Sequence, residues 1–171
     1  MDILEIIKSR RSIRAFQEKD IPQEIIEKMM EALIWAPSAG NLQSRKFYFV
    51  FNKKIKNELA QASFGQTFIA QAPLVIVGCL DINIEKKYGE RGKNLYAICD
   101  VSASIENLML YLQYEKLASC WVGAFQEEKV KKILNLSDNL RPIVICPVGY
   151  PAENPPAPSR FSKNRVIEVL R

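Results

Sequence analysis

Residues 95–118, LYAICDVSASIENLMLYLQYEKLA, limit the possible folds of this chain more than any other stretch. Their apolar side chains recur at helical spacing and would cover nearly every side of the resulting helix. A helix that is apolar on most sides has to be covered by other parts of the protein on most sides. We therefore expect this helix to run through the centre of the fold or of an oligomer.

Four shorter apolar runs have the length and the β-branched or aromatic content of strands. They are FYFVF from Phe47, PLVIVGCL from Pro73, SCWVGAF from Ser119 and LRPIVICPVGYP from Leu140. The second run is apolar almost throughout, which predicts a strand that is buried on both faces.

Helical periodicity also predicts helices before and between these strands. The predicted helices cover residues 3–8, 20–36, 53–62 and 127–136. In the second of them, Asp20 would cap the first turn, Gln23 would complete a capping box, and Pro37 would stop the helix. The polar segment 81–94 contains two glycines and is interpreted as a loop. Elements in this order predict one domain with an α+β or α/β three-layer architecture.

The composition excludes several classes of protein. Of 171 residues, 48% are hydrophobic and 25% charged, as in an ordinary globular domain. The absence of histidine excludes imidazole metal sites, and the four cysteines are too scattered for a thiolate site, so we expect no metal. Their apolar surroundings predict reduced thiols in the core. The sequence begins with no signal-peptide pattern and has no uninterrupted apolar run of roughly 20 residues, so we expect a cytoplasmic protein that binds no membrane.

A cluster of positive charge lies in residues 9–16, SRRSIRAF. If this segment is extended, Arg10, Ser12 and Arg14 lie on one side of it, because side chains alternate between the two faces of a strand. Two guanidinium groups flanking a hydroxyl form a strip of hydrogen-bond donors that suits phosphate or another planar anion. The ligand would be a phosphorylated small molecule or a nucleic-acid backbone. The net charge of +5, without a sustained basic block, is only weak support for the second.

Two further segments stand out. The motif APSAGNLQ, residues 36–43, is on its own typical of a helix stop and a turn, although its exposed amides are also able to bond the edge of a heterocycle. The segment 151–171 begins with a Pro-rich stretch, which we expect to be extended. Its later residues RVIEVL have the composition of an added strand.

Four motifs, SRRSIRAF, APSAGNLQ, ENLMLYLQYEKLASCWVGAF and PVGYP with the Arg-bearing tail, follow one another along the chain. In this order they resemble the FMN-dependent nitroreductase family, and the resemblance covers essentially the whole chain. It implies an α+β three-layer sandwich with a central mixed sheet flanked by helices. It also implies an intertwined homodimer with two FMN sites at its interface, in which residues 1–171 form one domain and the tail 151–171 crosses to the partner.

Carried over residue by residue, the resemblance assigns FMN contacts to Arg10, Arg11, Ser12, Arg14, Pro37, Ser38, Ala39, Asn41, Gln66, Trp121, Val122, Gly123 and Arg160. Arg10 and Ser12 would bind the phosphate with Arg11 beside them, and Arg160 would add a further contact. Arg14 would lie near N1 and the C2 carbonyl of the flavin, where reduction leaves negative charge.

For the flavin ring, the resemblance places the backbone N–H of Gly123 against N5, the atom that accepts hydride. Residues 37–41 would reach the ring from the partner subunit, and Gln66 would offer an amide to its edge. This chain departs from the family after Gln43, because residues 44–46 are SRK where many members have a proline and an aromatic residue.

The function implied is that of an NAD(P)H-dependent FMN oxidoreductase. It would take hydride from NADH or NADPH onto FMN and pass electrons to a nitroaromatic, a quinone or a similar small acceptor by a ping-pong mechanism. No side chain need act as a general acid or base, because the cofactor carries the chemistry. Two alternatives stay open. One is a specialised reductase of the same fold that fragments a flavin or removes a halogen, and the other is a basic nucleic-acid-binding module.

Overall fold

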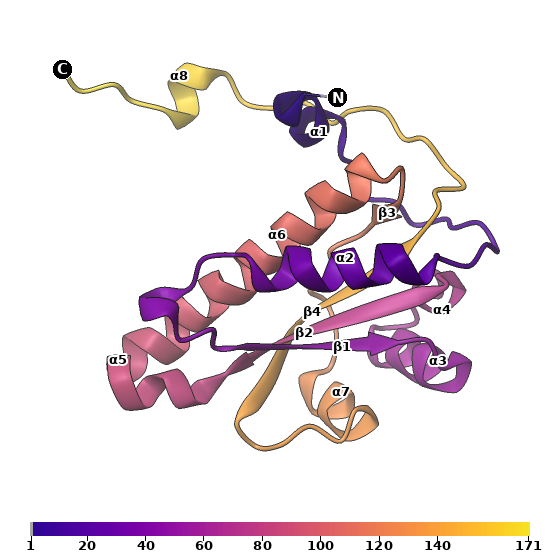
Figure 1. Cartoon of the computed structure of the whole chain (residues 1–171), viewed down its shortest axis with the longest axis horizontal. Coiled ribbons are helices and arrows are strands. Elements are labelled where there is room, and N and C mark those ends of the chain that lie inside the picture. The colour runs from indigo at the N-terminus through magenta and orange to yellow at the C-terminus, as the bar shows by residue number, and fades with distance from the viewer. Residues whose placement is uncertain (1) are drawn as a thin grey trace.

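The computed structural model describes residues 2–171 and contains one four-stranded sheet with helices on both of its faces (Figure 1). The strands β1 (Arg45–Val50), β2 (Leu74–Asp81), β3 (Ala118–Ser119) and β4 (Leu140–Gly149) are arranged in the order β1-β2-β4-β3. All of their pairings are antiparallel, and a single parallel bridge, Ser12 to Ser119, makes the sheet mixed. The predicted α+β class and the flanking helices are confirmed.

Strand β2 shows why the sheet has two covered faces. Its residues Leu74, Ile76 and Leu80 pack with α2 (Gln23–Ile34) and α6 (Ala97–Tyr114) on one face. The intervening side chains Val75, Val77 and Cys79 pack with α3 (Lys53–Ala62) and α7 (Glu127–Ile133) on the other. All six are buried, so the predicted two-sided burial of this strand is confirmed.

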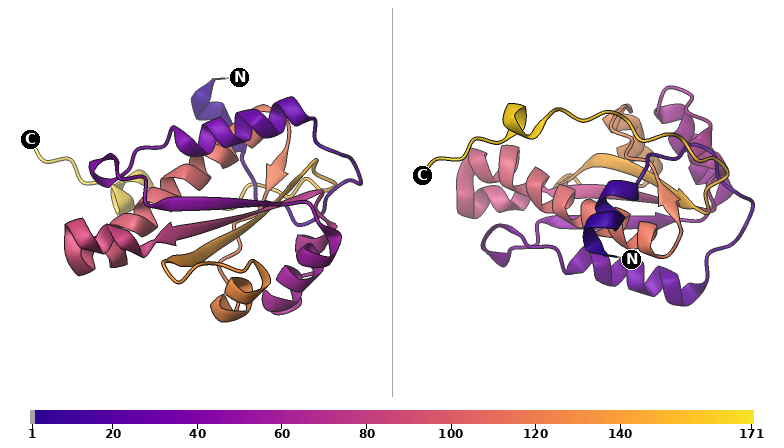
Figure 2. Two further views of the ribbon diagram at one scale, coloured as in Figure 1. Left: turned by 60° about the horizontal axis from the view of Figure 1, so that its bottom comes forward. Right: turned by 90° about the horizontal axis from the view of Figure 1, so that it is seen from above.

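The long apolar helix is present as α6, and its buried side chains join the core between the sheet and α2. By length and composition alone, the continuous helical run Ile82–Tyr114 would be able to cross a membrane. The core helix of a soluble protein passes the same test, and α6 crosses the face of the sheet in the way that a core helix does (Figures 1 and 2).

The interpretation of residues 81–94 as a loop is wrong. They form a short 3-10 turn (Ile82–Ile84), the helix α5 (Glu85–Arg91) and the start of a π-helical turn (Gly92–Tyr96) that leads directly into α6. The Asp81 side chain accepts a hydrogen bond from the Asn83 N–H and starts the first turn. Gly89 has a φ of 57°, so this glycine bends the helical path and does not end it.

Two other predictions about local structure need correction. Helix α2 begins at Gln23 after Pro22 and has no side-chain cap, so the predicted Asp20 capping box is wrong; the capping box of this chain joins Asp2 and Glu5 at the start of α1 (Ile3–Ser9). The strand predicted from Ser119 is reduced to β3 and an isolated bridge between Val122 and Ile145.

The tail leaves the body after β4. Its first residues still pair with the N-terminal segment, since the N–H of Gln17 donates to the Tyr150 carbonyl and the N–H of Ala152 donates to the Ala15 carbonyl, both at 2.9 Å. Beyond these contacts the tail runs away from the sheet (Figure 2). Within the described chain, the residues RVIEVL form no strand: α8 (Lys163–Val166) is a single helical turn, and an extended end follows it.

Candidate functional site

The segment that leaves α1 has the alternation predicted from its sequence. The N–H of Ile13 donates to the Ser119 carbonyl at 3.0 Å, and the Ile13 side chain is buried. Ser12 faces the other way, toward the Cys120 thiol. Burial raises the pKa of this thiol, while the charge of Arg14, a hydrogen bond with Ser12 and the charge of Arg10 each oppose the rise. Arg10, Ser12 and Arg14, named here the basic strip, therefore all lie near the Cys120 thiol, directly after β3.

Arg11 does not belong to this strip. Its guanidinium turns back to the end of α1 and donates to the carbonyls of Lys8 at 2.7 Å and Arg10 at 2.9 Å. These carbonyls have no partner inside the helix, and a cation stabilises the negative end of the helix dipole. The side chain predicted to lie beside the phosphate contacts thus acts as a helix cap.

Two residues beside the basic strip were missed from the sequence. The backbone N–H of Arg14 donates to the carboxylate of Glu153, and the Arg14 guanidinium lies 6.0 Å from the ring centroid of Phe68 in α4 (Phe68–Gln71). Glu153 is the one acidic residue in the stretch 151–162, and that isolation is the signal that would have pointed to it. Its carboxylate fixes the strip at the Arg14 end.

The 121–124 segment lies close to the same helix. The side-chain amide of Gln66 donates to the carbonyls of Ser63 at 2.9 Å and Ala124 at 3.1 Å. Phe68, two residues after Gln66, lies beside the Arg14 guanidinium. The turn that leads into α4 therefore contacts both the Arg14 end of the basic strip and the 121–124 segment.

Gly123 is exposed, and a Cβ added to it would meet only Nε1 of Trp121, at 3.8 Å. A cavity of about 260 Å³ opens beside Trp121 and Gly123 and is lined further by Ile98, Ser102, Phe125, Glu127, Arg141, Pro142 and Ile143. Val122 is different: its side chain is buried, and its N–H and carbonyl both pair with Ile145 at 2.9 Å. The backbone of Gly123 is therefore accessible to a ligand beside this cavity, whereas the backbone of Val122 is not.

Residues 37–41, named here the 37–41 loop, lie far from the basic strip in a single chain. The loop includes the 3-10 turn Ala39–Asn41 and packs near Tyr88 of α5, whereas the strip lies by β3 and α4. Figures 1 and 2 place α5 and α4 at opposite ends of the long axis. In a single chain, the predicted FMN contacts Pro37, Ser38, Ala39 and Asn41 therefore lie together in one loop, apart from the predicted FMN contacts of the basic strip.

Arg160 lies in the tail, eight residues beyond the Ala152 contact with the N-terminal segment. It is exposed in the tail, and within residues 2–171 its hydrogen bonds go only to the neighbouring carbonyls of Pro158 and Ser159. One chain thus holds the basic strip, Gln66 and the 121–124 segment on one side and the 37–41 loop at the other end, with Arg160 in the exposed tail.

The cysteines are predicted to differ in reactivity. Cys79, Cys120 and Cys146 are buried, but Cys99 is exposed on α6, which corrects the placement of all four in the core. Burial raises the pKa of Cys79 and of Cys146 to about 12. A raised pKa keeps the thiol protonated, so at pH 8 only about one in ten thousand of these groups is the reactive thiolate.

In the folded protein we expect no more than one thiol per chain to react with an aromatic disulfide reagent at pH 8, and all four after unfolding. Fast reaction of two or more native thiols would contradict this.

These features define a class of protein. It is an α+β protein with one mainly antiparallel sheet, a strip of cationic and hydroxyl donors beside that sheet, and an open glycine segment that Gln66 and Phe68 link to the strip. Such an arrangement suits a flat ligand that carries an anionic group.

The chain belongs to the nitroreductase family. The sequence profile described as "Nitroreductase family" matches residues 7–79 and 64–150. A protein of Archaeoglobus fulgidus named for NADH dehydrogenase and NAD(P)H nitroreductase activity is 31% identical over 173 residues, covering 96% of this chain and 96% of the relative. A protein of Methanothermobacter thermautotrophicus with the same name is 29% identical over 170 residues, covering 97% of this chain and 86% of that one.

The fold comparison agrees with this assignment. The NADPH:FMN oxidoreductase from Vibrio harveyi, solved in complex with NAD⁺, superposes with a TM-score of 0.91 at 23% identity and covers 99% of this chain and 77% of its own. The predicted enzyme class, a nitroreductase-family NAD(P)H oxidoreductase, is confirmed. The family match places the chain among oxidoreductases and not in the alternative class of nucleic-acid-binding modules.

Proposed function

We propose that this chain is a homodimeric FMN oxidoreductase that accepts hydride from NADH or NADPH and passes electrons to a nitroaromatic, a quinone or a similar small acceptor in a ping-pong sequence. The observation that carries the proposal is that Arg10, Ser12 and Arg14 all lie near the Cys120 thiol, three residues before the open backbone of Gly123. We further propose that residues 1–171 act as one domain in the cytoplasm.

The residues present fit FMN. Arg10 and Ser12 offer charged and neutral donors for the phosphate. Phe68 lies beside Arg14, and Gln66 bonds the carbonyl of Ala124, the neighbour of Gly123. Bound FMN would supply the two-electron chemistry. Arg14 would stabilise the negative charge that reduction leaves near N1 and O2, and the carboxylate on its backbone N–H keeps the segment in place. Gly123 would allow close approach at N5, because it has no side chain to obstruct the ring.

A second subunit would complete the site. In the proposed dimer the 37–41 loop and Arg160 of one chain reach the strip of the other, and the tail 151–171 docks on the partner's sheet. The exposed edge strand β1 provides a place for the tail to pair. Exposed apolar side chains support an extensive interface, since a monomer rarely exposes so many; they are Ile3, Leu4 and Ile7 of α1, Ile34 and Trp35 at the end of α2, and Val166, Ile167, Val169 and Leu170 of the tail.

The test is spectroscopic. The purified protein should be yellow, or should become so with added FMN, and should bind one FMN per chain. Anaerobic titration with NADH and then with NADPH should bleach the flavin absorbance with at least one of them, and an added quinone should restore it. A chain that binds no FMN at saturating concentration disproves the proposal. Bleaching without reoxidation by any quinone or nitroaromatic favours the specialised reductase.

Substitution of Gly123 should separate chemistry from stability. Because a Cβ at this position would make only an ordinary contact with Trp121 Nε1 at 3.8 Å, Gly123→Ala and Gly123→Val should change the free energy of unfolding by no more than about 0.5 kcal/mol. The added carbons would hold the ring away from its productive position, so the rate of FMN reduction by NADH should fall by about tenfold or more, and further for valine. Stopped-flow absorbance measures this rate. Wild-type rates in both variants with FMN bound would remove Gly123 from the site.

A further inference from the structure

The backbone of the 37–41 loop, together with Gln43, has a strained conformation. Gly40 and Asn41 have φ values of 55° and 54°, and Gln43 just beyond has 52°, all in the left-handed region that side chains other than glycine rarely adopt. Two non-glycine residues in this region cost free energy and persist only where the surrounding structure fixes them. The contacts that fix this loop are therefore informative.

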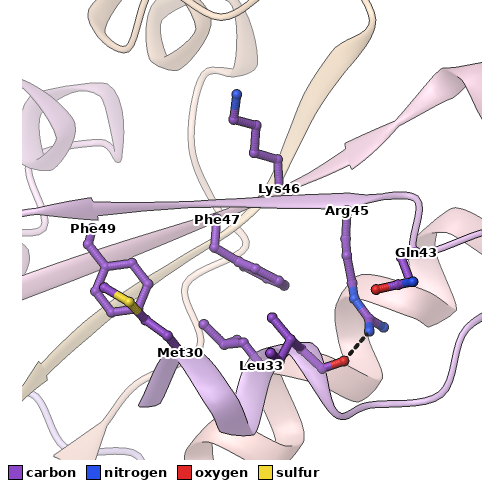
Figure 3. A pocket seen from close by; sticks show the side chains of 8 residues that line it. Met30, Leu33, Gln43, Arg45, Lys46, Phe47 and Phe49 are labelled. Atoms are coloured by element: carbon purple, nitrogen blue, oxygen red, sulfur yellow. Dashed lines mark hydrogen bonds between the residues drawn. The ribbon is translucent and has the colours of Figure 1, made fainter. Parts of the chain in front are cut away.

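Inside the loop, Ser38 accepts hydrogen bonds from the Asn41 N–H at its carbonyl and from the Gln43 N–H at its Oγ, both at 3.0 Å. Arg45, the first residue of β1, fixes the start of the loop to the end of α2 and to α6. One of its guanidinium nitrogens donates to the carbonyls of Pro37 at 3.1 Å and Asp100 at 3.4 Å. The other donates to the carbonyls of Ile34 at 2.9 Å and Ala36 at 2.7 Å. Figure 3 shows the side chain reaching from β1 to the end of α2. A planar group with several donors in fixed directions is able to hold four carbonyls at once, and a lysine ammonium is not.

Asp100 of α6 provides the second constraint. Its Oδ1 accepts a hydrogen bond from the Ala39 N–H at 2.9 Å, at the centre of the loop. The side chain is buried, and its Oδ2 has no hydrogen-bond partner within residues 2–171. A buried oxygen without a partner lowers stability, so stability alone does not explain this carboxylate. Burial lowers the pKa of Arg45, and the negative charge of Asp100 raises it. The Asp100 carboxylate therefore offsets part of the free-energy cost of burying the Arg45 charge.

We propose that Arg45 and Asp100 are positioning residues, which hold the 37–41 loop in the one conformation that meets the flavin of the partner subunit. The inference rests on the proposed FMN site. It also gives a role to Arg45, one of the residues 44–46 that depart from the family pattern: its guanidinium holds the start of the loop by hydrogen bonds. Neither side chain need touch the cofactor, because both act through the loop backbone.

Asp100 offers a matched pair of variants. Asp100→Ala and Asp100→Asn remove the same charge, but the asparagine keeps an oxygen that accepts from Ala39. We expect Asp100→Ala to raise the dissociation constant for FMN by about ten- to a hundredfold and to speed amide exchange at Ala39, and Asp100→Asn to restore most of both. A purely structural role would change the unfolding midpoint of both variants without this rescue. FMN fluorescence and amide hydrogen exchange measure the two effects separately.

Arg45 has its own control on the same strand. Lys46 points to the opposite side of β1 (Figure 3), so Arg45→Met and Lys46→Met remove one charge each from neighbouring positions. Arg45→Met should weaken FMN binding and expose the loop amides to exchange, and Lys46→Met should do neither. If Arg45→Met does not fold, the Asp100 pair decides.

Failures of the two proposals are distinguishable. A wild-type chain that binds no FMN disproves the proposed function and the inference with it. A wild-type chain that binds FMN, with Asp100→Ala and every folded Arg45 variant within about twofold of its dissociation constant, overturns the inference alone.

Discussion

Replacing Arg10 with alanine is expected to weaken FMN binding by about ten- to a hundredfold, whereas replacing Arg11 should change it little. A charge-assisted hydrogen bond to a phosphate contributes roughly 1.5–3 kcal/mol, which corresponds to that range. Arg10 lies in the basic strip with Ser12 and Arg14, while the Arg11 guanidinium is bonded to carbonyls at the end of α1. Titration of FMN fluorescence with each variant measures the dissociation constants.

The two arginines differ in a second observable. Loss of the Arg11 cap should destabilise α1 by about 0.5–1 kcal/mol, because a cation near a helix C-terminus contributes an amount of this order. Arg10→Ala should leave the unfolding free energy closer to that of the wild type. Equal FMN affinities for Arg10→Ala and the wild type would remove the phosphate assignment, and an Arg11→Ala protein that loses FMN as strongly would show that Arg11 swings into the site on binding.

Deletion of the tail after Ala157 is expected to abolish both the dimer and FMN binding. The deletion keeps the contacts of Ala152 and Glu153 with the N-terminal segment, so the body should remain folded. It removes Arg160 and the exposed apolar residues Val169 and Leu170, which are 70% and 88% exposed in the single chain and need a partner surface. Because the proposed site spans two chains, loss of the dimer also removes the partner's loop, and dimer stability and FMN affinity fall together.

Sedimentation velocity with detection at the flavin wavelength follows mass and cofactor in one experiment. The full-length Arg160→Ala variant is the control, since it keeps the tail but loses the expected phosphate contact. It should remain a dimer and bind FMN less tightly. A truncated chain that sediments as a dimer with one FMN per chain would show that the tail plays no part in assembly.

Local patterns were enough to predict much of this structure. The alternation of Arg10, Ser12 and Arg14 follows from extended geometry alone, and the burial of β2 on both faces follows from its uninterrupted apolar run. The segment 81–94 was missed because glycine is compatible with both a loop and a bent helix, and here the turn started by Asp81 decided between them. Composition does not distinguish these two outcomes.

Other features depend on contacts that are distant in sequence. The open backbone of Gly123 and the closed one of Val122 differ only because Val122 pairs with Ile145, a contact that the sequence does not display. The role of Arg11 as a cap and the contact of Glu153 with Arg14 likewise depend on where the chain turns. Whether RVIEVL forms a strand depends on a second molecule, so neither its composition nor a single chain determines it.

The distance between the basic strip and the 37–41 loop has a genetic consequence if the proposed dimer forms. In that dimer each chain would contribute the strip to one site and the loop to the other, so each subunit would be half of two different catalytic units. A dimer assembled from one subunit with a defective strip and one with a defective loop would combine both defects in one site and leave the other entirely wild type. Two inactive alleles would therefore complement each other within a single cell, at up to half of the normal activity in each mixed dimer.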